Sequence, residues 1–248
     1  MADALAWTLA WAGIGAAVGW LMRDWWRTRG SEQRQRQQEH EAVKACLGED
    51  VSALDEELWR LGRDLADAEY HGDARRDYER AVAINDAARR ATDQLSSVIL
   101  ADAITDALAE ARYAMACARS RLAAESVPER RLPCFFNPRH GPSVADVRWH
   151  DAPGEPLDVP ACAAHAPRIA AAEEPDSLHI WTGRQRVPYW QATVAFYAYA
   201  TGYFRGDWAG SKDGAQAAIQ AGLLGNILGA DAAFWGLTGG DSGGGGGC

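Results

Sequence analysis

The chain begins with an uninterrupted apolar stretch. From Ala4 to Met22 there is no charged residue, and tryptophans lie toward its ends and just after it, at Trp7, Trp11, Trp20, Trp25 and Trp26. A helix over these residues would be about 28 Å long, close to the thickness of the hydrocarbon core of a bilayer. Tryptophan is enriched where membrane and water meet. The pattern therefore predicts a transmembrane anchor over residues 1–22, with the lipid bilayer as its partner.

Basic residues follow this stretch and none precedes it. The arginines are Arg23, Arg27, Arg29, Arg34 and Arg36. Positive charge next to a span favours the cytoplasmic side, so we expect a single-pass protein of the cell membrane with its N-terminus outside and its bulk in the cytoplasm. A cleaved signal peptide would need a basic start. A buried core helix is the alternative interpretation. Residues 23–48 are expected to form a basic and polar juxtamembrane segment.

The next region has helical periodicity and predicts a bundle over residues 49–125. Apolar residues recur three and four apart, which is typical of a coiled-coil-like seam. Breaks at Gly72 and near Ser96 and Ser97 divide the region into two or three antiparallel helices. The residues expected to face inward are Val51, Leu54, Leu58, Leu61, Leu65, Ala68, Tyr78, Ala81, Val82, Ala88, Ala91, Leu95, Val98, Ile104, Leu108, Ala111, Met115 and Leu122.

Charged and sulfur-containing side chains in this region are expected to be structural. Acidic and basic residues alternate at helical spacing, which is typical of a solvated, ion-paired helix face. Cys46 and Cys117 lie among apolar positions and are predicted to be packed thiols without chemistry.

Residues 126–190 change character, because prolines become frequent and short β-like runs appear. Residues 147–149 and 157–159 are predicted to pair as strands. Residues 178–181 and 186–190 are predicted to form a hairpin, in which Pro188 keeps the last strand at an edge. We expect a small α+β module here.

Two cysteines and two histidines in this module are candidate metal ligands: Cys134, His140, Cys162 and His165. Two thiolates and two imidazoles are the ligand set of a closed structural zinc site. Cys162 and His165 open an alanine-rich helical pattern, as the second ligand pair does in treble-clef-like zinc folds. The five residues between Cys134 and His140 exceed the spacing of a tight zinc knuckle. A small β fold with a packed cysteine, or a Cys134–Cys162 disulfide, therefore remains an alternative.

The sequence contains few signs of catalysis. Neither a His-Glu-x-x-His motif, nor a Gly-x-Ser-x-Gly motif, nor a phosphate-binding glycine loop is present. A thiolate–imidazole pair of Cys134 and His140, oriented by His150 or Asp151, is the enzymatic alternative. No catalytic residue and no organic cofactor is predicted.

The C-terminal part is aromatic and then glycine-rich. Residues 191–238 are expected to form an apolar segment that is loosely packed or interfacial. Within this segment, residues 214–230 are expected to form a small helix lying on protein or membrane, with a second membrane span as the alternative. Residues 239–248 are mostly glycine and predict a disordered tail ending in Cys248.

The composition of the chain argues against two classes of protein, those that bind nucleic acid and small secreted proteins held together by disulfides. The formal net charge is −9, which argues against nucleic acid as a partner because phosphate binding requires a basic face. Five scattered cysteines do not indicate a secreted disulfide framework.

The stretch Cys-Phe-Phe-Asn-Pro-Arg-His-Gly-Pro, with residues 159–162 and 186–190, resembles a group of membrane-anchored proteins of high-GC Gram-positive bacteria. The resemblance implies an N-terminal span, a helical region and a glycine-rich tail. It implies no activity.

Together these patterns predict a mainly α protein: a transmembrane helix, a helical bundle, a small Cys/His module and a disordered tail. The expected function is that of a membrane-tethered, non-enzymatic scaffold or adaptor with a structural zinc site. Protein partners or self-association are expected, the latter through glycine pairs such as Gly15 and Gly19. A membrane-surface enzyme that uses a Cys/His pair or a bound metal is the alternative.

Overall fold

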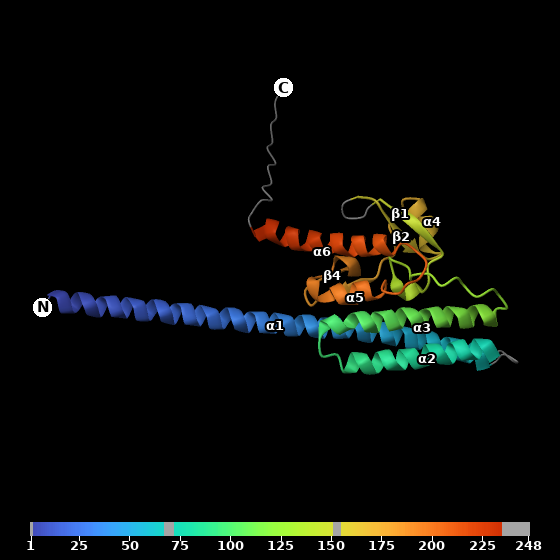
Figure 1. Ribbon diagram of the computed structural model, residues 1–248, viewed down its shortest axis with the longest axis horizontal. Coiled ribbons are helices and arrows are strands. Elements are labelled where there is room, and N and C mark those ends of the chain that lie inside the picture. Colours follow the sequence, from blue (N-terminus) through green and yellow to red (C-terminus); the bar gives the residue numbers. More distant parts are fainter. Residues whose placement is uncertain (1, 67–71, 151–154, 235–248) are drawn as a thin grey trace, which may run out of the picture. The chain divides into compact units, whose positions relative to one another are not determined.

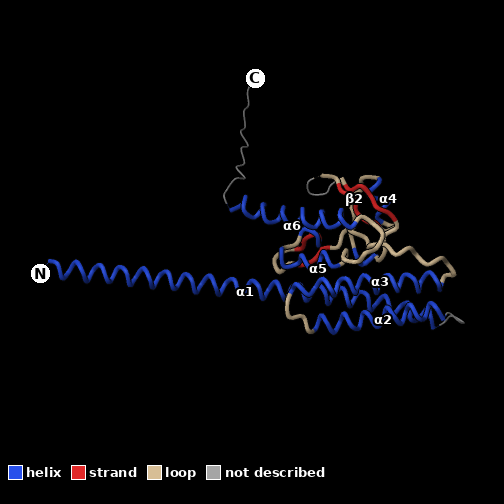
Figure 2. Tube along the Cα trace, viewed as in Figure 1, coloured by secondary structure: helices blue, strands red, loops and turns tan. Residues whose placement is uncertain are grey.

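The protein is mainly helical, with two small β-hairpins (Figures 1 and 2). This computed structural model describes residues 2–66, 72–150 and 155–234. Side chains are described from residue 20 to residue 225 of these, apart from 21, 23, 24, 27 and 28. The chain divides into two compact units, residues 1–41 and residues 42–248.

The first unit is the N-terminal part of helix α1 (Ala2–Ala66). After Gly30 its described side chains are polar and largely exposed, and pairs one helical turn apart support it. Gln35 donates to Glu39 over 3.0 Å, and Arg36 lies 3.9 Å from Glu32. Within the described residues, no helix combines the length and the apolarity that crossing a bilayer requires. The side chains before Trp20 lie outside the described set, so the anchor at residues 1–22 stays a prediction.

In the second unit, the rest of α1 packs with α2 (Gly72–Asp93) and α3 (Ala101–Leu122). α2 runs antiparallel to both neighbours, whereas α1 and α3 run parallel. The seam predicted for α1 is confirmed from Val51 to Leu65. Alanine lines much of the α2–α3 contact, with Ala81, Ala88 and Ala111 buried. Small side chains let the helix axes approach closely.

The connections between these helices agree with the sequence in part. Ser96 and Ser97 lie in the link between α2 and η1 (Val98–Leu100), as predicted. Gly72 begins α2 instead of ending the first helix, and Ala68 lies outside the described residues. Ala91 was expected to face inward and is exposed. Thr92 is buried in its place because its hydroxyl can donate to the carbonyl of Ala88, at 2.8 Å.

Both predicted hairpins are confirmed. Strand β1 (Ala145–Trp149) pairs antiparallel with β2 (Leu157–Ala161), with Val147 opposite Val159. Strand β3 (His179–Trp181) pairs with β4 (Arg186–Pro188), and Pro188 lies at the edge. The short helix α4 (His165–Ala170) follows β2.

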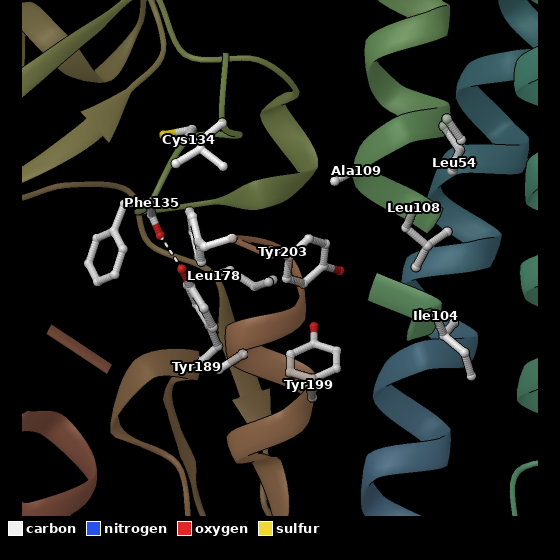
Figure 3. Packing of buried hydrophobic residues seen from close by; sticks show 14 of the residues in the cluster. Leu54, Ile104, Leu108, Ala109, Cys134, Phe135, Leu178, Tyr189, Tyr199 and Tyr203 are labelled. Carbon is white, nitrogen blue, oxygen red and sulfur yellow. Dashed lines mark hydrogen bonds between the residues drawn. The ribbon is translucent and has the colours of Figure 1, made fainter. Parts of the chain in front are cut away.

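The aromatic segment after Trp190 is core, and the expectation of a loosely packed segment is wrong. It forms η3 (Tyr189–Gln191), η4 (Val194–Phe196) and α5 (Tyr197–Gly202). Figure 3 shows Tyr199 and Tyr203 between α3 and the loops of the module. Phe196, Tyr199, Tyr203 and Phe204 are all at most 1% exposed. These aromatic residues have no regular spacing because the chain changes from 3₁₀ to α geometry between η4 and α5, while their side chains all pack into the same core.

The last described element, α6 (Lys212–Phe234), lies on the module. Ala215, Ala218 and Ile219 are buried against it, and the helix contacts β2 and η3. Glycines on this face allow the approach, since a Cβ on Gly222 would lie 2.2 Å from the Trp190 carbonyl oxygen. The helix predicted over residues 214–230 is thus present and longer than expected, and its described N-terminal half lies on protein. Residues 235–248, with the expected tail, lie outside the described residues.

Replacing Gly202 tests the contact of α5 with α3. An added Cβ would lie 2.6 Å from Asp102 Cα and 2.1 Å from the Thr105 hydroxyl oxygen. We expect Gly202→Ala to lower the free energy of unfolding by about 1–3 kcal/mol, the usual cost of overpacking, as measured by urea denaturation.

Gly48→Ala is the matched control for that measurement. Gly48 lies within α1, and nothing lies within 4 Å of its would-be Cβ. This change should raise stability by roughly 0.5–1 kcal/mol, as alanine does in helix interiors. Equal effects of the two substitutions would contradict the close approach.

Candidate metal centre

The first two candidate ligands lie on one closed loop. The N–H of Ser143 donates to the Leu132 carbonyl over 2.9 Å, and the N–H of Cys134 donates to the Gly141 carbonyl over 3.0 Å. At its tip Asn137 caps the 3₁₀ turn η2 (Pro138–His140). Gly141 closes the loop with φ +78°, a conformation that favours glycine. The loop thereby returns His140 to the side of Cys134 despite the wide spacing.

The second pair is placed by β2 and α4. The N–H groups of His165 and Ala166 donate to the Cys162 carbonyl over 3.0 and 2.9 Å, which begins the helix directly after the strand. The N–H of Phe135 donates to the Pro160 carbonyl over 2.7 Å and ties the first loop to β2. Each pair is therefore fixed by main-chain hydrogen bonds, and one such bond joins the two.

The four side chains converge on one point. Their potential ligand atoms all lie within 4.8 Å of one another. Nδ1 of His165 is 3.1 Å from the Cys134 sulfur and 3.6 Å from the Cys162 sulfur, and Nδ1 of His140 is 3.5 Å from the Cys162 sulfur. Around a tetrahedral zinc ion, neighbouring sulfur and nitrogen ligands would be about 3.5 Å apart. The cluster is thus close enough to hold a metal ion.

The two sulfurs have different electrostatic surroundings. The Cys134 thiol donates a hydrogen bond to the Cys162 sulfur, and this bond is the main cause that lowers the pKa of Cys162, to about 3. His140 and the N–H groups of His165 and Ala164 lower it further, against the effect of burial. Burial raises the pKa of Cys134, and its bond to Cys162 adds to this shift. Without a metal, the pair therefore shares one negative charge.

The imidazoles are supported from outside the cluster. The hydrogen bond with Cys162 raises the pKa of His140, although partial burial opposes it. The amide of Asn137 lies 3.1 Å from His140 Nε2. The ring of His165 is buried and meets Phe136 edge to face at 5.4 Å. Groups that orient a ligand ring in this way tune the affinity of a site for its ion.

A wall of aromatic residues lies behind the ligands. Phe135, Phe136, Trp149 and Trp190 form mutual ring contacts with centroids 5.0–6.3 Å apart, and all are at most 5% exposed. The Tyr189 hydroxyl donates to the Phe135 carbonyl over 2.6 Å (Figure 3). The site is therefore dry on this side. His140 is its exposed member, beside a surface hollow that Cys162 also lines.

Two of the alternative arrangements, the Cys134–His140 pair and the Cys134–Cys162 disulfide, are not formed in the structure. Cys134 lies against His165, so the thiolate–imidazole pair of Cys134 with His140 is not the one formed. Cys134 and Cys162 have free thiols and are not joined by a disulfide. His150 is exposed in a turn, and Asp151 lies outside the described residues. Across the described part of the chain, this is the one cluster of three or more His, Cys, Asp or Glu residues suited to a metal.

The packed thiols behave as predicted. Cys46 and Cys117 are buried, and burial is the main cause that raises the pKa of each, for Cys46 to about 12. Asn137, whose amide lies beside the His140 ring, was not predicted as part of the site. Its position within the loop between Cys134 and His140 is the signal that could have pointed to it.

Comparisons of the chain with protein-family models, with curated proteins and with solved structures find no match. The resemblance to membrane-anchored proteins of high-GC Gram-positive bacteria therefore stays a prediction.

The uneven charge of the two cysteines can be tested by alkylation of the metal-free chain. A thiol with a pKa of about 3 is already a thiolate at pH 6. We expect the rate of iodoacetamide labelling at Cys162 to be nearly constant from pH 6 to pH 8, whereas an ordinary thiol would gain about a hundredfold. Peptide mass spectrometry assigns the labelled cysteine.

Cys46 is the internal control for that labelling. It is 2% exposed with a raised pKa, so it should stay unlabelled until the chain is denatured. A Cys162 rate that climbs with pH like that of a free thiol would contradict the proposed charge distribution.

Proposed function

We propose that this chain is a membrane-tethered, non-enzymatic scaffold or adaptor whose Cys/His module is held together by a structural zinc ion. The observation that carries the proposal is the convergence of Cys134, His140, Cys162 and His165 within 4.8 Å. Two sulfur and two nitrogen donors complete a tetrahedral shell without help from water or substrate.

The donor set favours zinc over the other common ions. Thiolates are soft ligands that select zinc, copper(I) or iron–sulfur clusters, whereas magnesium and calcium take oxygen ligands. Imidazole together with thiolate at tetrahedral spacing is typical of zinc. Because one thiol is deprotonated without metal, the ion would need to displace few protons.

A structural role fits the site better than a catalytic one. A catalytic zinc keeps one coordination position open for water or substrate. Here four protein ligands are available, and three of them are buried. Cys134, the nucleophile of the enzymatic alternative, is fully buried with a raised pKa, both of which oppose nucleophilic attack.

A protein-binding role is supported by the surface. Ile99 on η1 and Val194 on η4 are 68% and 62% exposed, and these two elements are in contact. Clustered apolar side chains on a surface are typical of interaction sites. Membrane attachment is inferred from the sequence of residues 1–22 and its flanking arginines.

Metal content tests the zinc proposal directly. The chain purified under reducing conditions without chelator should contain one zinc per molecule by elemental analysis. Cys162→Ser should abolish zinc binding and expose the buried Trp149 and Trp190, seen as a shift of tryptophan emission to longer wavelength. Cys117→Ser is the matched control, because that thiol lies outside the cluster, and it should keep the metal.

The enzymatic alternative predicts a different result. If zinc is absent from a folded chain, and a thiol-directed activity probe labels Cys134 only in the native state, the structural-zinc proposal fails. Retention of zinc in Cys162→Ser would equally contradict the assigned ligands.

Membrane attachment is tested by deletion. Removing residues 1–22 should move the chain from the membrane pellet to the soluble fraction of lysed cells, because about 20 apolar residues supply the span. Removing residues 239–248 is the control and should leave the chain in the membrane. Unchanged fractionation after the first deletion would contradict the anchor.

A further inference from the structure

A carboxylate far from the metal ligands in sequence is buried beside their loop. Asp50, on α1, is 0% exposed. One of its oxygens accepts from the Nε of Arg139, and the other accepts from the hydroxyls of Tyr199, at 2.7 Å, and Tyr203. Both tyrosines are buried, and Figure 3 shows them between α3 and the module. Asp50 thus joins α1, α5 and the 3₁₀ turn that ends at His140.

Arg139 is held at two points. Asp50 binds its side chain, and Nε of Arg112 donates to its main-chain carbonyl over 3.1 Å. Arg112 is itself 0% exposed, and its Nη2 donates to the Asp50 carbonyl over 3.4 Å. Two helices of the bundle, α1 and α3, therefore meet at one residue of the module.

The hydrogen bond from Arg112 fixes the peptide group between Arg139 and the candidate ligand His140. The Arg139 carbonyl belongs to the same amide as the N–H of His140, and that N–H donates to the Asn137 carbonyl over 3.0 Å. Both faces of this short turn are consequently fixed, one by the module and one by the bundle. His140 is the exposed ligand and makes its closest sulfur contact at 3.5 Å, so its placement depends most on this support.

Asp50 and Arg112 are fully buried and Arg139 is partly buried, and burying charged groups is unfavourable unless their geometry is specific. Asp50 and Arg112 both hydrogen-bond to Arg139, the residue directly before the candidate ligand His140, so the contacts of this ionic cluster point to a positioning role. Mutating a residue that supports a metal ligand commonly lowers the affinity of the site for its metal ion by about 10- to 100-fold.

We propose that Asp50 of the helical bundle is a positioning residue for the metal centre, acting on His140 through Arg139. The inference rests on the proposed metal site. It adds that the helical bundle, through Asp50, sets the affinity of this site for its metal ion. Metal affinity and the conformation of the bundle are then linked in both directions.

The test is a metal titration of the full chain in detergent, using Co²⁺ followed by its visible absorption and Zn²⁺ in competition with a chelator. Asp50→Asn keeps the shape of the side chain and removes its charge. We expect its metal affinity to fall about tenfold or more. Asp55→Asn is the matched control, because Asp55 lies on the same helix and pairs instead with Asn85 and Arg89. Its affinity should stay within about twofold, as for an independent site.

A double-mutant cycle separates positioning from general destabilisation. In a His140→Ala background the effect of Asp50→Asn on affinity should vanish, since the ligand through which it acts is gone. An undiminished effect in that background would overturn the inference, as would an unchanged affinity in Asp50→Asn alone.

A second variant keeps the test decisive if Asp50→Asn lowers the helical circular-dichroism signal. Tyr203→Phe removes one hydroxyl from Asp50 and should weaken Co²⁺ binding in the same direction, and an unchanged affinity would overturn the inference. The two proposals fail differently. A wild-type chain that binds no metal removes both, whereas a wild-type chain that binds metal and a variant that binds equally well remove only the positioning role.

Discussion

Two thiols and two imidazoles share a space that is dry on one side, and this constraint organises the module around them. Polar groups taken out of water cost free energy unless they find partners, and here they find mainly one another. Cys162 is within 3.6 Å of both histidines, and Cys134 within 3.1 Å of one. The loop closed by Gly141 and the turn from β2 into α4 both serve to hold these atoms together.

The aromatic residues explain how so small a module maintains that site. Its hairpins are short, and two-stranded sheets are marginal alone. Phe135, Phe136, Trp149 and Trp190 supply the apolar area that the strands lack, and each aromatic ring buries about 150–250 Å². Tyr199 on α5 and Tyr203 just after it lie between α3 and the module, and one core cluster contains residues of both, so the module has no separate core. Residues 42–248 accordingly form one compact unit.

How far the sequence predicts this structure depends on whether the information is local. The α1 seam and both hairpins follow from periodicity and turn residues, and they are confirmed. The four candidate ligands also lie together as expected, close enough to hold a metal ion, and their residue types were the signal, because Cys and His are common metal ligands. The aromatic segment was misjudged, since Phe196 to Phe204 change geometry within a few residues and have no single period. Asp50 was missed because it reads as one more acidic residue on a charged helix, and only the contact with Arg139 distinguishes it.

The contact of Asp50 with Arg139 changes what a metal ion bound at the four candidate ligands could do. If zinc only cross-linked the module, its loss would loosen residues 126–190 and leave the helices intact. Arg139, however, is held by α1 through Asp50 and by α3 through Arg112. Release of the His140 loop would leave the Asp50 carboxylate and the Arg112 guanidinium buried with fewer partners, and such groups are strongly destabilising. Loss of the ion would therefore weaken the packing of α5 against α3. The elements η1 and η4, which carry the exposed Ile99 and Val194, contact these same helices. If that surface binds a partner as proposed, metal occupancy and partner binding would be coupled through one buried carboxylate.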